Sequence, residues 1–328
     1  MNRISLKKAV ASIKKYKRFL ISSHTSPEGD ALGSELAVYS LLKKLGKEAF
    51  IVNEDPLPPE YNFLPGKESI NLYKPDLGNI DFDCMLILDC TDLSRIGLVR
   101  KLNKDNKPII NIDHHISNKE FGLVNWVEPE ASSASEMVFR LYKEMRVPFD
   151  GNSALFLYAG MLTDTGSFRY SNASGFTHKA VAELLGFRID VNQVYKNIYE
   201  DIPFGDMQIL IRALSGIHTV NAGKIAWVEV PAKLLRHKKL SFDLTDHLLS
   251  FVRAIRGVEV AALFKENLGV RNEIRVNLRS TGLADVNKVA QGFGGGGHRT
   301  ASGCTIRGKL SDVRAKVISS IRRNLKIT

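Results

Sequence analysis

The chain has 328 residues, of which 44% are hydrophobic and 25% are charged; this composition is typical of soluble globular proteins, and the length favours two domains over one. A formal net charge of +11 favours anionic partners, although it does not distinguish nucleic acid from small phosphates, nor a binding surface from a merely solvated one. No apolar run is long enough to cross a bilayer, and the N-terminal segment lacks a signal-peptide core, so we expect no membrane association. Three cysteines without CxxC spacing argue against a zinc ribbon or a disulfide framework and indicate a reducing, cytoplasmic compartment.

Apolar runs and helical periodicities alternate in the first half of the chain. The predicted helices cover residues 6–17, 31–45, 133–144 and 153–162, and the predicted strands cover residues 19–23, 48–52, 85–88 and 108–110. Alternating strands and helices of these lengths predict an α/β domain with a mostly parallel sheet and helices on both faces.

The second half of the chain has a different pattern. From residue 177 to about residue 217 it is all-helical, which suits a connector between domains. A second α/β region then begins near Lys224, with predicted strands at residues 225–228, 258–264 and 274–278 and a closing basic amphipathic helix at 310–325. We therefore predict an N-terminal domain at residues 1–190, a helical connector at 191–220 and a smaller C-terminal α/β domain at 221–328.

Four acidic or histidine-containing loops follow strands or helix ends. They contain His24, Glu28 and Asp30; Asp89 and Asp92; Asp113, His114 and His115; and Asp164. Ligands of open α/β sheets bind beyond the carboxyl ends of the strands, so we expect these loops to meet in space. So many carboxylates would repel one another unless cations lay among them. Oxygen and imidazole ligands without thiolates suit manganese or a comparable divalent ion. Two ions that share a bridging carboxylate would form a clamp for in-line displacement at phosphorus, with a bridging water as nucleophile.

Each acidic position also has a purely structural interpretation. Asp30 can cap the helix that follows it. Asp89 can cap a turn, and Asp164 can form an Asx-turn. Asp92 has the weakest functional claim because it can pair with Arg95. Four acidic loops at the ends of neighbouring elements nevertheless favour the metal site over four independent structural roles.

A glycine-rich loop at residues 292–298 is the main feature of the C-terminal region. Glycine turns let backbone N–H groups approach a phosphate without obstruction, although a plain linker is the alternative. Arg275 and Arg279, followed by Ser280, lie on a predicted strand with the same side-chain parity, so both arginines can face an anionic ligand. The alternative is an exposed strand face, and Phe293 is a weak candidate for stacking on a base.

These motifs resemble those of the DHH phosphoesterase superfamily. Its signature corresponds to residues 113–115, its opening His-x-x-x-Asp-x-Asp motif to residues 24–30, and its later aspartates to Asp89 and Asp164. The Gly-Gly-Gly-His of its DHHA1 substrate domain corresponds to residues 295–298. By length and layout, the chain is most similar to the subgroup of bifunctional oligoribonucleases and pAp phosphatases (nanoRNases).

The resemblance implies a two-metal phosphoesterase with its active site in a cleft between two domains. The implied substrates are short single-stranded RNA and small nucleotides such as 3′-phosphoadenosine 5′-phosphate (pAp), and the implied cofactor is two Mn²⁺ ions, with Co²⁺ or Mg²⁺ as substitutes. A small second domain that closes the cleft should favour short substrates over long ones, and a homodimer is a further expectation. A cyclic or linear dinucleotide phosphodiesterase and a catalytically weak nucleotide- or RNA-binding module remain alternatives, whereas the glycine loop argues against a family II pyrophosphatase.

The resemblance also implies a role for each motif residue. His24 and Glu28 would hold one ion, Asp30, His114 and Asp164 the other, and Asp89 would bridge them. Asp113 would support an adjacent histidine, and His115 would face the scissile phosphate. The substrate would be gripped by Arg275, Arg279, Ser280, Gly295, Gly296, Gly297 and His298. One position departs from the family pattern, because Glu28 stands where the family usually has Asp, and its extra methylene should move that carboxylate by about one carbon–carbon bond.

Overall fold

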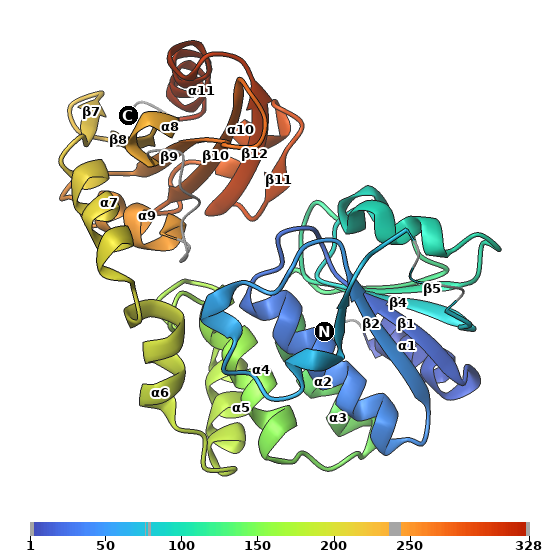
Figure 1. Cartoon of the computed structure of the whole chain (residues 1–328). Coiled ribbons are helices and arrows are strands. Elements are labelled where there is room, and N and C mark those ends of the chain that lie inside the picture. The colour runs from blue at the N-terminus through green and yellow to red at the C-terminus, as the bar shows by residue number, and fades with distance from the viewer. Residues whose placement is uncertain (1–2, 76, 78–79, 236–243, 326–328) are drawn as a thin grey trace. The chain divides into compact units, whose positions relative to one another are not determined.

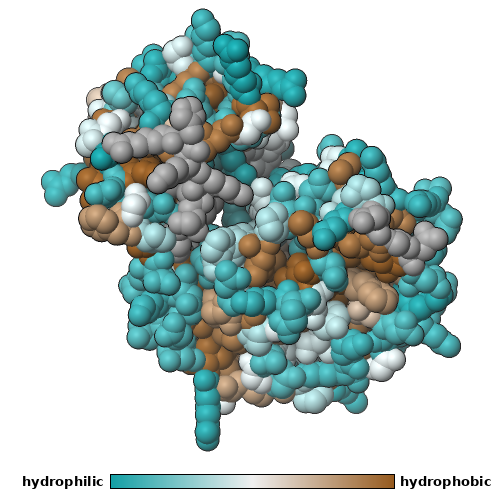
Figure 2. Space-filling view, in the orientation of Figure 1, coloured by the Kyte–Doolittle hydropathy of each residue, from teal (hydrophilic) through white to brown (hydrophobic). Residues whose placement is uncertain are grey.

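The computed structural model describes residues 3–75, 77, 80–235 and 244–325. It divides into two compact units, Met1–Ile198 (unit 1) and Tyr199–Thr328 (unit 2), each built around its own sheet (Figure 1). Among the described residues, no helix combines the length and hydropathy that a membrane span requires. The face of the molecule in Figure 2 is largely hydrophilic, with smaller apolar patches between the polar side chains.

Unit 1 contains a six-stranded sheet with the order β3-β2-β1-β4-β5-β6, in which every neighbouring pair is parallel. The strands are β1 (Arg18–Ser22), β2 (Glu48–Asn53), β3 (Ile70–Leu72), β4 (Cys84–Leu88), β5 (Ile109–Asp113) and β6 (Val124–Val127). The chain moves outward from β1 first to one side and then to the other, so the order reverses between β1 and β4. The crevice beyond the carboxyl ends at such a reversal is the usual ligand site of open α/β sheets.

Helices and one 3₁₀ segment cover the two faces of this sheet. The helices are α1 (Arg3–Lys15), α2 (Gly29–Lys44), α3 (Ala134–Met145), α4 (Gly151–Asp164) and α5 (Gly175–Leu185). The opposite face packs on the 3₁₀ segment Leu93–Leu102, whose Ile96 and Val99 are buried against Met85 and Ile87 of β4. The sequence therefore predicted the parallel sheet correctly, but one face is covered by 3₁₀ turns instead of α-helix.

Close packing between α2 and α4 fixes the position of the first acidic loop. A Cβ on Gly33 of α2 would collide with the backbone carbonyl of Phe156 on α4, so only glycine allows the two helices to come this close. The predicted start of α2 was wrong by two residues, because Glu28 is the N-cap residue and the helix begins at Gly29. Asp30 therefore lies inside the first turn and does not cap its own helix.

Unit 2 contains a mixed six-stranded sheet with the order β11-β12-β10-β9-β8-β7. Its strands are β7 (His218–Val220), β8 (Ile225–Val230), β9 (Val260–Glu266), β10 (Glu273–Ser280), β11 (Gly296–Gly297) and β12 (Ala301–Arg307). Only β8 and β9 are parallel; the other neighbouring pairs are antiparallel. The three strands predicted in this region are present, whereas β7 was not predicted and β11 lies in the stretch that was predicted to be a glycine-rich loop.

Two apolar clusters lie on the two faces of the unit 2 sheet. Helices α10 (Val286–Gln291) and α11 (Leu310–Asn324) pack on one face against residues such as Val276 of β10. Helices α7 (Phe204–Leu214) and α9 (Thr245–Arg253) pack on the other face against residues such as Leu263 of β9. The predicted all-helical stretch contains α5, α6 (Val191–Tyr195), the π turn Lys196–Glu200 and α7, and the short α8 (Ala232–Leu235) follows β8.

Candidate metal centre and active site

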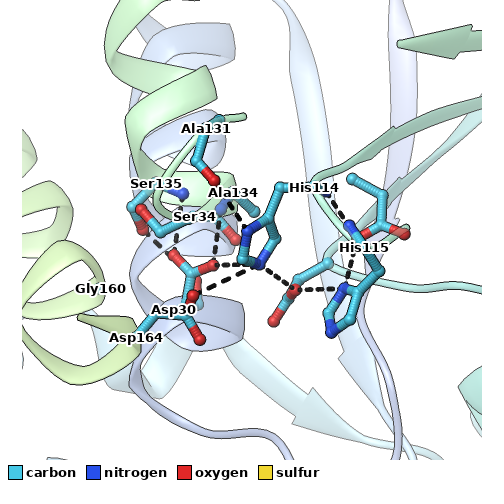
Figure 3. Close-up of polar contacts among 12 residues, drawn as sticks. Asp30, Ser34, His114, His115, Ala131, Ala134, Ser135, Gly160 and Asp164 are labelled. Carbon is cyan, nitrogen blue, oxygen red and sulfur yellow. Dashed lines mark hydrogen bonds and ion pairs between the residues drawn. The ribbon is translucent and has the colours of Figure 1, made fainter. Parts of the chain in front are cut away.

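The predicted acidic and histidine residues of unit 1 meet at the carboxyl end of the parallel sheet. His24 follows β1, Asp89 follows β4, and His114 and His115 follow β5. Asp30 comes from the first turn of α2, and Asp164 is the last residue of α4. Parallel strands all end at the same edge, which is why residues so far apart in the sequence converge here (Figure 3).

Three carboxylates surround the Nε2 atom of His114. The distances are 3.5 Å to Asp89 Oδ1, 3.5 Å to Asp164 Oδ2 and 3.8 Å to Asp30 Oδ2 (Figure 3). The other ring nitrogen, Nδ1, lies 3.3 Å from the carbonyl oxygen of Ala131, which can only accept a hydrogen bond. Nδ1 therefore carries the proton in the neutral ring, and Nε2 presents its lone pair to the carboxylates, as a metal-binding histidine requires.

Asp89 lies between two groups of side chains. Its Oδ2 is 3.4 Å from His24 Nε2, whereas its Oδ1 faces His114 and lies 3.4 Å from His115 Nδ1. The residue adopts the left-handed conformation with φ 50°, which is uncommon for a non-glycine residue and concentrates at functional sites. The two oxygens of one buried carboxylate thus point toward two separate sets of ligands.

Asp30 is oriented by the start of a helix that lies about a hundred residues further along the chain. Its Oδ2 accepts a 2.6 Å hydrogen bond from Ala134 N, and its Oδ1 a 2.8 Å bond from Ser135 N. These are the first N–H groups of α3, where the helix dipole also favours a negative charge. The sequence suggested that Asp30 could cap α2, the helix that contains it. In the structure it caps the start of α3 instead.

Asp113 holds His115 in a fixed orientation. Its Oδ1 accepts a 2.7 Å hydrogen bond from His115 Nδ1, and its Oδ2 a 2.6 Å bond from Asn118 Nδ2. Burial would raise the pKa of Asp113, but His115 outweighs this effect and lowers the pKa, so the carboxylate is the acceptor. Asn118 also donates to Asn111 Oδ1 at 2.7 Å, which ties the turn after β5 back to the strand.

The charges of the cluster are strongly coupled. Burial raises the pKa of Asp30 to about 6 and that of Asp164 to about 7. Burial alone would lower the pKa of His114, but the negative charges of Asp164 and Asp89 outweigh it, and the pKa of His114 is raised. Burial alone would raise the pKa of Asp89, but His114 and His24 outweigh it, and the pKa of Asp89 is lowered. Asp30 and Asp164 therefore resist ionisation in the metal-free protein, chiefly because they are buried.

The residues of this cluster fit divalent cations. Asp89 Oδ1 and Asp164 Oδ2 are buried, and neither accepts a hydrogen bond from any described residue. Asp30, Asp89 and His114 each offer a ligand atom within 4.8 Å of the others, as do Asp89, Asp113 and His115. The nearby thiol of Cys90 donates to Asp92 O, and burial raises its pKa to about 12, so it offers no thiolate. Oxygen and imidazole ligands in this arrangement suit a hard or borderline divalent ion.

The structure gives less support to two of the predicted acidic residues, Glu28 and Asp92. Glu28 is exposed and belongs to neither of these ligand groups. Asp92 does not form the predicted ion pair with Arg95 among the described contacts; instead it accepts a hydrogen bond from Ser94 N and pairs with Lys119. Its pKa is lowered to about 2, chiefly by Lys119, as expected for a structural cap on the surface.

The predicted residues of unit 2 lie on β10 and in the glycine turn. Arg275 is exposed, and Arg279 NH2 lies 2.8 Å from Asp246 Oδ1. Ser280 is buried, and its hydroxyl donates to Ala284 O at 2.8 Å. The strand pairing of Gly296 and Gly297 with β12 forms the turn before His298, whose carbonyl accepts a 2.7 Å hydrogen bond from Ser302 Oγ.

A Cβ would not fit at two positions of the glycine turn. At Gly295 it would collide with the backbone carbonyl of Gly303 on β12. Gly297 has φ 140°, and a Cβ there would lie 2.6 Å from Ala301 O. The glycines are therefore required for the close pairing of β11 with β12.

Sequence reasoning missed the residues that position the acidic cluster. These are Asn118 and the first residues of α3. Asn118 carried a weak signal, since it lies in the turn directly after the Asp113-His114-His115 triplet. The contact between α3 and Asp30 had none, because it depends on the tertiary packing of two helices.

Known proteins with similar sequences and structures span nearly the whole chain. The bifunctional oligoribonuclease and PAP phosphatase NrnA of Thermus thermophilus is 29% identical over 93% of this chain and 89% of its own length. The protein of the same name from Bacillus subtilis is 25% identical over 90% of this chain and 92% of its own length. The crystal structure of an exopolyphosphatase-related protein from Bacteroides fragilis superposes with a TM-score of 0.85 at 25% identity, covering 98% of this chain and 96% of that one.

Two family models match separate parts of the sequence. Residues 18–161 match the N-terminal domain of the DHH family, and residues 223–325 match the DHHA1 domain. The first match contains five of the six predicted metal-ligand positions, and the second contains the glycine turn and the arginines of β10. Together they cover most of the chain, which therefore carries the N-terminal domain of the DHH family and a DHHA1 domain.

Proposed function

We propose that this chain hydrolyses short RNA oligonucleotides to mononucleotides and 3′-phosphoadenosine 5′-phosphate to AMP and phosphate. The observation that carries the proposal is Asp89, whose two oxygens face two separate sets of ligands, as a two-metal phosphoesterase requires. The printed names of the relatives from Thermus thermophilus and Bacillus subtilis support the choice of substrates, since each relative matches this chain over about nine-tenths of its length.

Two sets of residues would hold the metal ions, for which Mn²⁺ is the proposed identity. Asp30, His114 and Asp164 would hold one ion together with Asp89 Oδ1. His24 and Glu28 would hold the other together with Asp89 Oδ2. Bound divalent ions supply Lewis acidity toward phosphoryl oxygens and activate water for attack on phosphorus. The protein's own contribution is to fix the ligands before substrate arrives, as the α3 N–H groups do for Asp30.

His115 is the proposed contact to the scissile phosphate. Its Nδ1–H is held by Asp113, so the ring cannot turn freely, and Nε2 is the atom that would contact the substrate. Asn118 fixes the other oxygen of Asp113, which makes the orientation of the imidazole depend on three residues of one turn. A pre-oriented donor of this kind stabilises charge that develops on phosphoryl oxygens.

In unit 2, the proposed nucleotide-binding surface is the face of β10 that carries Arg275 and Arg279. These side chains point away from the core residues Ile274, Val276 and Leu278, which alternate with them along the strand. Arg279 is oriented by its ion pair with Asp246, and Arg275 is exposed. Guanidinium groups bind phosphate through paired hydrogen bonds.

The test is a hydrolysis assay with the purified full chain in Mn²⁺. The substrates are pAp, ribonucleotides of two to five residues, a long single-stranded RNA, cyclic and linear dinucleotides, and pyrophosphate. We expect release of AMP and mononucleotides from pAp and short RNA, with a loss of at least about a hundredfold in Asp89→Asn and His115→Gln. Asp105→Asn, which changes an exposed aspartate elsewhere in unit 1, is the control and should keep full activity.

Three outcomes of this assay would change the proposal. Preferential cleavage of cyclic or linear dinucleotides would make the chain a dinucleotide phosphodiesterase. Binding of oligonucleotides without hydrolysis in manganese, cobalt or magnesium would make it a binding module. Full activity in Asp89→Asn would remove the observation on which the proposal rests.

A further inference from the structure

The backbone of residues 131–135, between β6 and the first turn of α3, orients two of the proposed metal ligands. The carbonyl oxygen of Ala131 lies 3.3 Å from His114 Nδ1 and fixes the tautomer of that ring (Figure 3). The first two N–H groups of α3 donate to the two carboxylate oxygens of Asp30 at 2.6 and 2.8 Å. A shift of this segment would therefore move both ligands at once.

An asparagine connects the same segment to a third proposed ligand. The side-chain amide of Asn172 donates to the carbonyl oxygen of Ser132 at 3.0 Å and to that of Asp164 at 3.1 Å. One amide group has two hydrogens, so it can make both bonds together. The end of α4 that carries Asp164 is thus tied to segment 131–135, and three proposed ligands depend on the position of this segment.

The carboxylate of Glu136 holds segment 131–135 in place. Glu136 has no exposed surface, and its Oε2 accepts a 2.8 Å hydrogen bond from Ser132 Oγ. The same oxygen accepts a 2.6 Å bond from Thr177 Oγ1 in the first turn of α5. Its Oε1 pairs with Arg140, one turn further along α3. A buried carboxylate is costly unless its charge is paired and its oxygens are hydrogen-bonded, and Glu136 meets both conditions.

Glu136 can act on the metal ligands only through this segment. Within the described part of the chain, no hydrogen bond or ion pair joins Glu136 to a proposed ligand; its partners are Ser132, Thr177 and Arg140. These partners come from three places in the fold, namely the segment itself, α5 and the second turn of α3. The carboxylate therefore ties the segment to two helices that provide no ligand.

We propose that Glu136 is a positioning residue for the ion assigned to Asp30, His114 and Asp164. It fixes segment 131–135, and the segment fixes the ligands. The inference rests on the metal assignment in the proposed function and adds a residue that controls the affinity for the ion without binding it. Ligands that are already fixed lose little conformational entropy when an ion binds, so loosening the segment lowers the affinity.

The test is a Mn²⁺ titration of the metal-free full chain, with free Mn²⁺ measured by electron paramagnetic resonance. Ser132→Ala removes one donor to Glu136 and leaves every proposed ligand in place. It should weaken one binding step at least about tenfold, and this should be the step that Asp164→Asn also weakens. Thr177→Val removes the donor from α5 and should weaken the same step several-fold, whereas Thr177→Ser keeps the hydroxyl and should bind almost like the native chain.

Ser153→Ala is the matched control. Ser153 is also buried, and its Oγ also donates to a carboxylate oxygen at 2.8 Å, that of Asp150. This bond lies at the amino end of α4, the end opposite to Asp164. The control should lower the urea midpoint of the metal-free protein, as Ser132→Ala does, but its affinity for Mn²⁺ should equal that of the native chain.

Unchanged Mn²⁺ affinity in both Ser132→Ala and Thr177→Val would overturn the inference. Equal weakening in Ser153→Ala would also overturn it, because the effect would then be a general loss of stability. Weaker Mn²⁺ binding in the two variants, with no hydrolysis of any nucleotide by the native chain, would support the inference and refute the proposed function. Hydrolysis by the native chain with no change of Mn²⁺ affinity in the variants would refute the inference alone.

Discussion

Glu35 is a buried carboxylate of unit 1 that gives a direct test of the electrostatics described above. It lies on α2 with no exposed surface, and its Oε2 accepts a 2.8 Å hydrogen bond from Asn53 Nδ2. Burial raises its pKa from 4.5 to about 7, because the bonds from Asn53 and Ser23 only partly offset the loss of water. We predict that Glu35→Gln stabilises the metal-free protein at alkaline pH and has little effect at acid pH.

The magnitude follows from the size of the pKa shift. A rise from 4.5 to about 7 corresponds to roughly 3 kcal/mol of differential stability between the protonated and ionised forms. Because the pKa is raised in the folded state, the unfolded chain binds fewer protons between pH 4.5 and 7, and the free energy of unfolding falls as the pH rises through this window. The glutamine keeps the shape and the hydrogen-bonding capacity of the neutral acid and removes this loss.

The assay is urea denaturation in EDTA at pH values from 5 to 8, followed by tryptophan fluorescence. The chain has two tryptophans, and Trp126 is fully buried in unit 1. A Trp227→Phe background therefore restricts the signal to the unfolding of unit 1. The difference in unfolding free energy between variant and parent should grow by about 2–3 kcal/mol from pH 5 to pH 8. Glu48→Gln, an exposed glutamate, should show no such trend, and a pH-independent difference in Glu35→Gln would refute the reasoning.

Three further predictions follow from the packing and the ligand set. Mn²⁺ at a hundred times its dissociation constant should raise the unfolding free energy of the native chain by about 2.7 kcal/mol per site, as measured by thermal denaturation, and Asp89→Asn should lose most of this gain. Asn118→Ala should lower kcat about tenfold with unchanged Mn²⁺ content, because it releases Asp113 but removes no metal ligand; a loss of bound metal without a change in kcat would contradict this role. Gly33→Ala should cost about 1–3 kcal/mol in urea denaturation because its Cβ would collide with a carbonyl of α4, whereas Gly175→Ala, at a helical glycine with open space around it, should be close to neutral.

The sheet strands that carry the site could be predicted because they are apolar along their whole length. All five residues of β4 are buried, which is the pattern of a central parallel strand. The edge strands could not be predicted in the same way, since β3 has no fully buried residue and β6 buries only Trp126. Short edge strands are defined by their pairing partners, and a sequence pattern of three or four residues does not specify a partner.

The motif residues of the site could also be predicted, because they lie after strands, at the start of α2 or at the end of α4. The residues that orient these motif residues could not be predicted. The hydrogen bond from Ala134 N to Asp30 joins residues 104 positions apart, and it exists only because α3 begins beside the first turn of α2. The same packing explains why a Cβ at Gly160 of α4 would collide with the hydroxyl of Ser135 and lie 2.9 Å from Asp30 Oδ1. Such constraints come from three helices at once and leave no local sequence signature.

The burial that makes this cluster unfavourable without metal is also the source of its affinity for cations. With the pKa of Asp164 raised to about 7 and that of Asp30 to about 6, metal-free unit 1 loses stability as the pH rises through this range, because both carboxylates must then ionise inside the protein. A doubly charged ion removes that penalty, and it gains most where the carboxylates are already fixed and shielded from water. Asp30, held by the N-terminus of α3 and almost fully buried, meets this condition. The affinity of this part of the site for a cation thus follows from where the fold places its carboxylates.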